Sequence, residues 1–125
     1  MKPKEFLRLL ERDKRCVHCG STGDDLIPHH RANRGMGGAG KDSPYNRPSN
    51  LLLLCSEANF LLEFDAKFAE RGRFFGWKLS KFVVPAEFPA YDSYSATWFY
   101  LTDDWSRVEI HNFGKGMLGE DRESV

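Results

Sequence analysis

The sequence predicts a single α+β domain, with an N-terminal helix, a central strand, loop, strand and helix, and a C-terminal β hairpin. Its 125 residues are enough for one domain with a modest core. Apolar residues recur at helical spacing near the N-terminus, and short apolar runs bounded by turn residues occur in the middle and near the end. We expect the domain over residues 1–112 and a flexible acidic tail over residues 113–125.

The first elements are a helix, a tight turn and a short strand. Residues 3–14 carry Phe6, Leu9 and Leu10 at helical spacing, with Pro3 in the first turn, where its missing N–H does no harm. A Cys-x-x-Cys turn closed by Gly20 follows. Residues 24–30 then read as a turn that enters a strand ending in two histidines.

Residues 31–49 predict a long loop, because they carry four glycines and two prolines and show no periodicity. A loop of this length inside a small domain is often functional. Residues 50–55 predict a buried strand, and Ser56 suits the N-cap of a helix with Asn59 at its N3 position. This helix is expected to run to Arg71 and end at Gly72.

The C-terminal part predicts a β appendage over residues 77–112. Residues 77–84 are expected to form a strand. Residues 97–101 and 107–111 flank the turn at 103–106, which is typical of a hairpin.

Composition limits the classes of function. The hydrophobic and charged fractions, 41% and 29%, are those of a soluble globular protein, and no apolar run approaches the roughly 20 residues of a membrane span. The N-terminal residues do not resemble a signal peptide, so a cytoplasmic location is expected. The net charge is zero, but residues 1–48 carry ten Lys and Arg against six Asp and Glu. An anionic partner would therefore be met by the N-terminal part.

The three cysteines are an odd number in a chain expected to be intracellular, which argues against a disulfide framework. Cys16 and Cys19 form a Cys-x-x-Cys turn, which suits half of a zinc knuckle, a redox pair or two small buried side chains. The adjacent His29 and His30 are equally ambiguous when taken alone. Neighbouring residues on a strand point to opposite sides, so the two imidazoles are expected to have different roles.

The order of these blocks resembles the HNH endonucleases, nucleases of the ββα-metal type, and phage-encoded members in particular. Cys16-x-x-Cys19, then His29-His30, a loop, Asn50 before an apolar strand, and Cys55 at the start of a helix follow the family's order over residues 16–72. The resemblance implies a ββα-metal core over about these residues and metal-dependent hydrolysis of phosphodiester bonds in DNA.

The resemblance also implies roles for individual residues. His29 would bind the catalytic divalent metal, His30 would be the general base, and Asn50 would orient that base through hydrogen bonds to backbone across the loop. Asn59 stands where the family has its last histidine, and its side-chain oxygen suits Mg²⁺ or Mn²⁺. Glu63 lies on the same helix face and is either a further metal ligand or a solvated residue paired with Lys67.

The family's structural zinc site is incomplete here. Cys16, Cys19 and Cys55 occupy three of the four cysteine positions that the resemblance implies, and Ala58 occupies the fourth. Structural zinc prefers four ligands, so Glu57 or His111 would have to complete the shell. The alternative is three buried free thiols.

We therefore expect a DNA endonuclease that nicks or cuts double-stranded DNA, as a monomer or a homodimer. The basic residues of the loop, Arg31, Arg34, Lys41 and Arg47, are expected to contact the nucleic acid. A phage origin would make packaging proteins reasonable partners. The rival hypothesis is a non-cleaving DNA- or RNA-binding module that kept the scaffold and lost the chemistry when histidine became Asn59.

Overall fold

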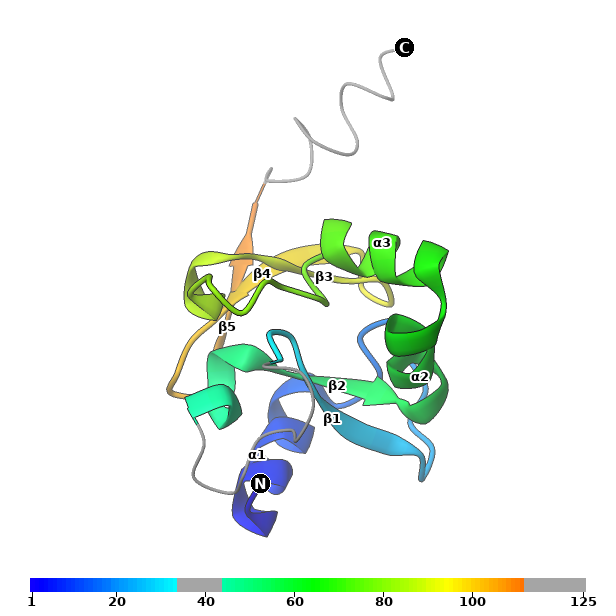
Figure 1. Ribbon diagram of the computed structural model, residues 1–125. Coiled ribbons are helices and arrows are strands. Elements are labelled where there is room, and N and C mark those ends of the chain that lie inside the picture. The colour runs from blue at the N-terminus through cyan, green and yellow to red at the C-terminus, as the bar shows by residue number, and fades with distance from the viewer. Residues whose placement is uncertain (34–43, 112–125) are drawn as a thin grey trace.

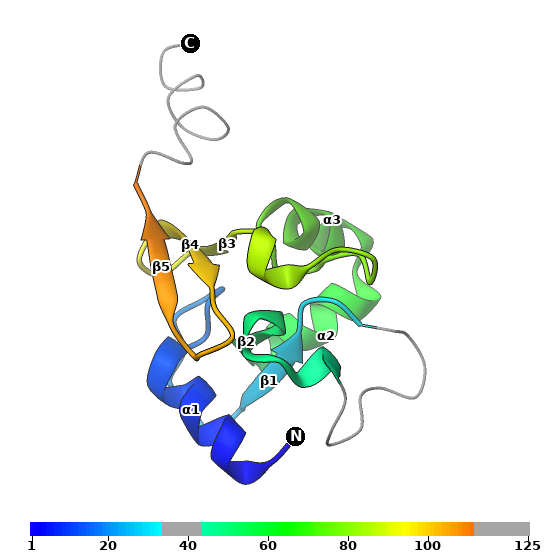
Figure 2. The ribbon, with the colours of Figure 1, turned by 90° about the vertical axis from the view of Figure 1, so that its left-hand side faces the viewer.

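The computed structural model describes residues 1–33 and 44–111 (Figure 1; Figure 2), and the tail expected over residues 113–125 lies outside them. The described residues form three α-helices and two antiparallel sheets, which confirms the predicted α+β class and N-terminal helix. In chain order the helices and strands are α1 (Pro3–Asp13), β1 (Leu26–His30), β2 (Leu51–Cys55), α2 (Ser56–Phe64), α3 (Ala66–Phe74), β3 (Ala90–Asp92), β4 (Thr97–Leu101) and β5 (Arg107–Ile110). Short 3₁₀ turns are η1 (Pro44–Asn46), η2 (Pro48–Asn50) and η3 (Pro85–Glu87).

The hairpin of β1 and β2 lies at the centre of the molecule (Figure 1). All five residues of β2 are buried, because alternate side chains enter two different cores. Leu51 and Leu53 pack with Leu9 of α1, whereas Leu52 and Leu54 join the larger core beneath α2 and the second sheet. A strand that is buried on both faces reads as a continuous apolar run, and this explains the run of four leucines.

The prediction of one continuous helix over residues 56–72 is wrong. Two helices form instead, α2 and α3, separated at Asp65, whose backbone is extended at φ −115° and ψ 114°. The Asp65 carboxylate accepts a hydrogen bond from the N–H of Phe68 at 2.8 Å and so caps α3. The N-cap of α2 is Cys55, not Ser56, because the Cys55 sulfur accepts the N–H of Ala58.

The second sheet has the strand order β3-β4-β5 and contains the predicted hairpin of β4 and β5. The strand expected over residues 77–84 is wrong. That segment makes a single parallel bridge, between Leu79 and Ala32. Its backbone groups are used elsewhere: the carbonyl of Trp77 accepts from a histidine of β1, and the N–H of Leu79 donates to the carbonyl of Arg31.

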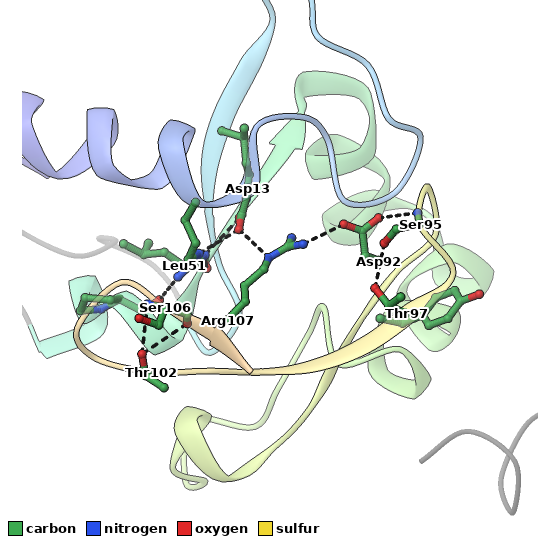
Figure 3. A network of polar contacts seen from close by, with 12 residues as sticks. Asp13, Leu51, Asp92, Ser95, Thr97, Thr102, Ser106 and Arg107 are labelled. Atoms are coloured by element: carbon green, nitrogen blue, oxygen red, sulfur yellow. Dashed lines mark hydrogen bonds and ion pairs between the residues drawn. The ribbon is translucent and has the colours of Figure 1, made fainter. Parts of the chain in front are cut away.

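A buried ionic network joins α1 to the second sheet (Figure 3). Arg107 of β5 lies between Asp13 and Asp92, with nitrogen to oxygen distances of 3.1 and 3.0 Å. Asp13 also pairs with Arg12 and accepts the N–H of Leu53 in β2. The charge of the buried Asp13 carboxylate is thus compensated by two guanidinium groups and one backbone donor. These contacts fix the position of the second sheet relative to the hairpin.

Candidate active site and cysteine cluster

His29 is a buried histidine whose ring orientation is set by a backbone carbonyl. Its side chain is on β1, and the residue is 5% exposed. Nε2 lies 2.6 Å from the carbonyl oxygen of Trp77. A carbonyl oxygen can only accept, so Nε2 carries the hydrogen and Nδ1 keeps its lone pair. Burial, chiefly, lowers the pKa of His29 to about 4, so the ring is neutral at pH 7.

Asn59 faces the free nitrogen of His29 from the first turn of α2. Its side-chain nitrogen lies 3.1 Å from Nδ1 of His29. A rotation of the amide by 180° would present the oxygen in its place, which is the atom that a hard cation prefers. A histidine that donates its other N–H to a carbonyl is typical of metal ligands. His29 and Asn59 could therefore supply two ligand atoms to a divalent cation.

His30 turns to the other side of the strand and binds the loop between β1 and β2. Its Nε2 lies 2.7 Å from the side-chain oxygen of Asn46, a buried residue of η1. The oxygen accepts, so Nε2 carries the hydrogen and Nδ1 of the neutral ring has the lone pair that a general base requires. Asn46 was not predicted as a site residue, because it lies in an aperiodic loop.

Asn50 fastens the two ends of that loop. Its side-chain oxygen accepts the N–H of Ala32 at 2.7 Å, and its side-chain nitrogen donates to the carbonyls of Ala32 and Tyr45 at 2.9 and 2.8 Å. These are hydrogen bonds to backbone across the loop, of the kind that the sequence led us to expect. Through them Asn50 holds η1, and with it the Asn46 partner of His30.

Arg31 is a structural residue, and the prediction that it contacts phosphate is wrong. Its side chain is 1% exposed, and its pKa is lowered by burial to about 9. Its guanidinium donates to five backbone carbonyls, those of Ser49, Gly76, Pro85, Phe88 and Pro89. A guanidinium has five N–H groups, so no donor remains for a nucleic acid.

The other predicted site residues are either exposed or lie outside the described residues. Glu63 is exposed and lies 3.9 Å from the ammonium of Lys78, which is a different partner from the expected Lys67. Arg47 is exposed beside η1. Arg34 and Lys41 lie outside the described residues. Lys78 was not predicted, yet its charge is close enough to His29 to contribute to the lowered pKa of that ring.

The three cysteines converge beside the start of α2. Their sulfur atoms all lie within 4.8 Å of one another, and those of Cys19 and Cys55 are 3.8 Å apart. Gly20, at φ 78°, closes the turn by donating its N–H to the carbonyl of Cys16 at 2.8 Å. The cluster could bind a metal ion such as zinc, since thiolates are its preferred ligands.

A fourth protein ligand does not join this cluster within residues 1–33 and 44–111. Neither Glu57 nor His111 belongs to the group, although both were candidates. The His18 ring lies edge-on against the rings of Phe68 and Trp77, with centroids 5.0 and 5.3 Å apart.

No protein-family model, curated protein or solved structure matches this chain. In the part of the chain that the structure describes, no helix is both long and apolar enough to cross a membrane.

The lowered pKa of His29 predicts that stability falls as the pH is lowered from about 6.5 to about 4. The unfolded imidazole takes up a proton in this window, whereas the folded ring does not, so acid favours unfolding. The loss from this one group approaches about 3 kcal/mol at pH 4. Urea unfolding at several pH values, with EDTA present, measures it.

The variant His29→Gln isolates the effect, and we expect a weaker pH dependence of its free energy of unfolding in this window. His111→Gln, at an exposed position, is the matched control and keeps the wild-type dependence. Equal pH dependence in wild type and His29→Gln would contradict a buried neutral ring.

Proposed function

We propose that the protein is a metal-dependent endonuclease that hydrolyses phosphodiester bonds of DNA in the manner of the HNH nucleases. One observation carries the proposal. At the junction of β1 and α2, Nδ1 of His29 faces the side chain of Asn59 at 3.1 Å, while the neighbouring His30 is oriented by Asn46 as a general base. We thus assign different roles to the two adjacent imidazoles, metal binding to His29 and proton transfer to His30.

In the proposed hydrolysis, residues of the chain accept the proton of water, hold the metal ion and bind a neighbouring phosphate. Nδ1 of His30 takes a proton from water as the water oxygen forms a bond to phosphorus. The bond from phosphorus to the 3′-oxygen breaks, and that oxygen takes a proton from solvent. A divalent ion such as Mg²⁺ or Mn²⁺, held by His29 and Asn59, would supply positive charge for the phosphate oxygens. The exposed Arg47 would pair with a neighbouring phosphate.

Zinc at Cys16, Cys19 and Cys55 would have a structural role in this proposal. Cys55 is the last residue of β2 and caps α2, while Cys16 and Cys19 precede β1. Burial raises the pKa of the Cys55 thiol, so this thiol stays protonated when no metal is bound. Bound zinc would deprotonate it and cross-link the turn to the start of the helix that carries Asn59.

A non-cleaving nucleic-acid-binding module is the second candidate, and one observation favours it. Both proposed ligands of the catalytic ion are neutral, and the Asn59 amide as placed donates to the very nitrogen of His29 that would bind metal. A site of this kind binds Mg²⁺ weakly, because carboxylates are the usual ligands of that ion. Such a protein would retain nucleic acid but not cut it.

Incubation with supercoiled plasmid and Mg²⁺ or Mn²⁺ distinguishes the two functions. We expect nicked product from the wild type and a loss of about 10² to 10⁴ in rate for His30→Ala, the range typical of a general base. Asn59→Leu should also lose activity, because it removes the oxygen ligand. His111→Ala is the control and should cut like the wild type.

The absence of relaxed or linear product with any divalent metal, from folded protein, would sink the nuclease proposal. Gel retardation of the same plasmid without cleavage would then favour the binding module.

The zinc proposal is tested by elemental analysis of protein purified without chelator. We expect about one zinc per chain in the wild type and little in Cys19→Ser, which removes one of three sulfur ligands. Glu57→Gln should keep its zinc, because Glu57 is outside the cysteine group. Wild-type protein that remains free of zinc even after refolding with the metal would rule the site out.

A further inference from the structure

A small cavity is lined in part by the loop between β1 and β2. It has a volume of about 250 Å³ and lies between η1 and the segment before η3. Its walls include Pro44, Val83 and Pro85, and cationic side chains are supplied by Arg47 and Lys81. Among the described residues that line the cavity there is no carboxylate. The site therefore combines apolar walls with a positive charge.

The cavity is connected to His30 through η1. Tyr45 of η1 lines the cavity, and the next residue, Asn46, accepts the hydrogen bond from His30. Asn50 also lines the cavity and donates to the carbonyl of Tyr45 at 2.8 Å. A group bound in the cavity would consequently contact Tyr45, the residue next to the Asn46 partner of His30.

The volume and the lining of the cavity indicate the class of ligand that would fit it. Pockets for drug-sized molecules measure roughly 300 to 1,000 Å³, so this one suits a single small ring system. A tyrosine and flat proline rings favour a planar aromatic group, and the two cations favour an anion attached to it. Inorganic phosphate would leave the apolar walls unused, and an uncharged apolar molecule would leave the cations unused. A mononucleotide unit uses both.

An exposed aromatic residue flanks the same cavity. Phe82 is 86% exposed, and the ammonium of its neighbour Lys81 lies 5.3 Å from its ring centroid. The face of this ring is therefore accessible to a stacking partner. Exposed aromatic rings next to cations are typical of surfaces on which unpaired bases stack.

We propose that this cavity holds one unpaired nucleotide of the substrate, next to the phosphate to be cleaved. The inference rests on the proposed nuclease function and narrows its substrate class. In a regular duplex the bases are stacked inside and must be unpaired, unstacked and flipped out before they can enter a pocket. The preferred substrates are therefore nucleic acids that already contain an unpaired base, such as a bulge, and not uniform double-stranded DNA.

Fluorescence anisotropy in EDTA tests the proposal without any cleavage. The probes are a labelled 20-base-pair duplex and the same duplex with one additional unpaired adenosine. We expect the wild type to bind the bulged duplex about tenfold more tightly, since stacking of one base contributes about that much or more. Free 2′-deoxyadenosine 5′-monophosphate should compete with the bulged probe more strongly than deoxyribose 5-phosphate does.

A matched pair of variants locates the effect. Val83→Trp fills the cavity and should abolish the preference for the bulge, while binding to the regular duplex stays within about twofold of wild type. Val84→Trp adds the same ring at the adjacent exposed residue, which does not line the cavity, and should keep the preference. The thermal unfolding of both variants shows that they are folded.

Equal binding of the two duplexes by the wild type, no binding of either, or a preference retained in Val83→Trp would each overturn the proposal. The two proposals fail separately. Plasmid nicking combined with equal binding of the two duplexes would refute only the nucleotide pocket. A bulge preference that Val83→Trp abolishes, without cleavage in any metal, would refute only the nuclease.

Discussion

The buried guanidinium of Arg31 is the constraint on which the rest of the structure depends. An uncompensated charge of this kind is too costly to bury, and here every N–H group is bound by a backbone carbonyl. The acceptors come from the residue before Asn50, from the end of α3 and from the region of η3. A single side chain thereby joins the ββα unit to the segment that links it to the second sheet.

The hydrogen bonds of Arg31 also determine how the rings of His29 and His30 are oriented. His29 lies on β1 and Arg31 directly follows that strand, and their side chains bind the backbone carbonyls of Trp77 and Gly76. The carbonyl that orients His29 is therefore fixed by the same segment that Arg31 holds, and Nδ1 is left to face α2. His30 points to the opposite side, where Asn46 and Asn50 hold the loop. The two adjacent imidazoles thus have different surroundings, because side chains alternate along a strand.

The sequence predicted the elements whose periodicity reflects burial, but not the roles of buried polar groups. The leucine run of β2, the N-terminal helix and the hairpin of β4 and β5 were all evident from pattern. Arg31 was misread as a phosphate contact, because a charge in a glycine-rich loop is normally exposed and the sequence does not show which carbonyls surround it. The break at Asp65 was missed because the apolar spacing continues across it. The contact between Asn46 and His30 arises only when the loop folds back against β1, so the sequence pattern does not indicate it.

The proposed metal site is tested most directly by titrating Mn²⁺ into isotope-labelled protein and following the side-chain NMR signals of His29 and Asn59. Paramagnetic broadening falls steeply with distance, so it reports where the ion lies and does not depend on cleavage. We expect these two side chains to broaden first, and we expect Asn59→Leu to abolish the effect while the cysteine turn is unaffected. Broadening confined to exposed carboxylates, with the signals of His29 and Asn59 unchanged, would contradict it.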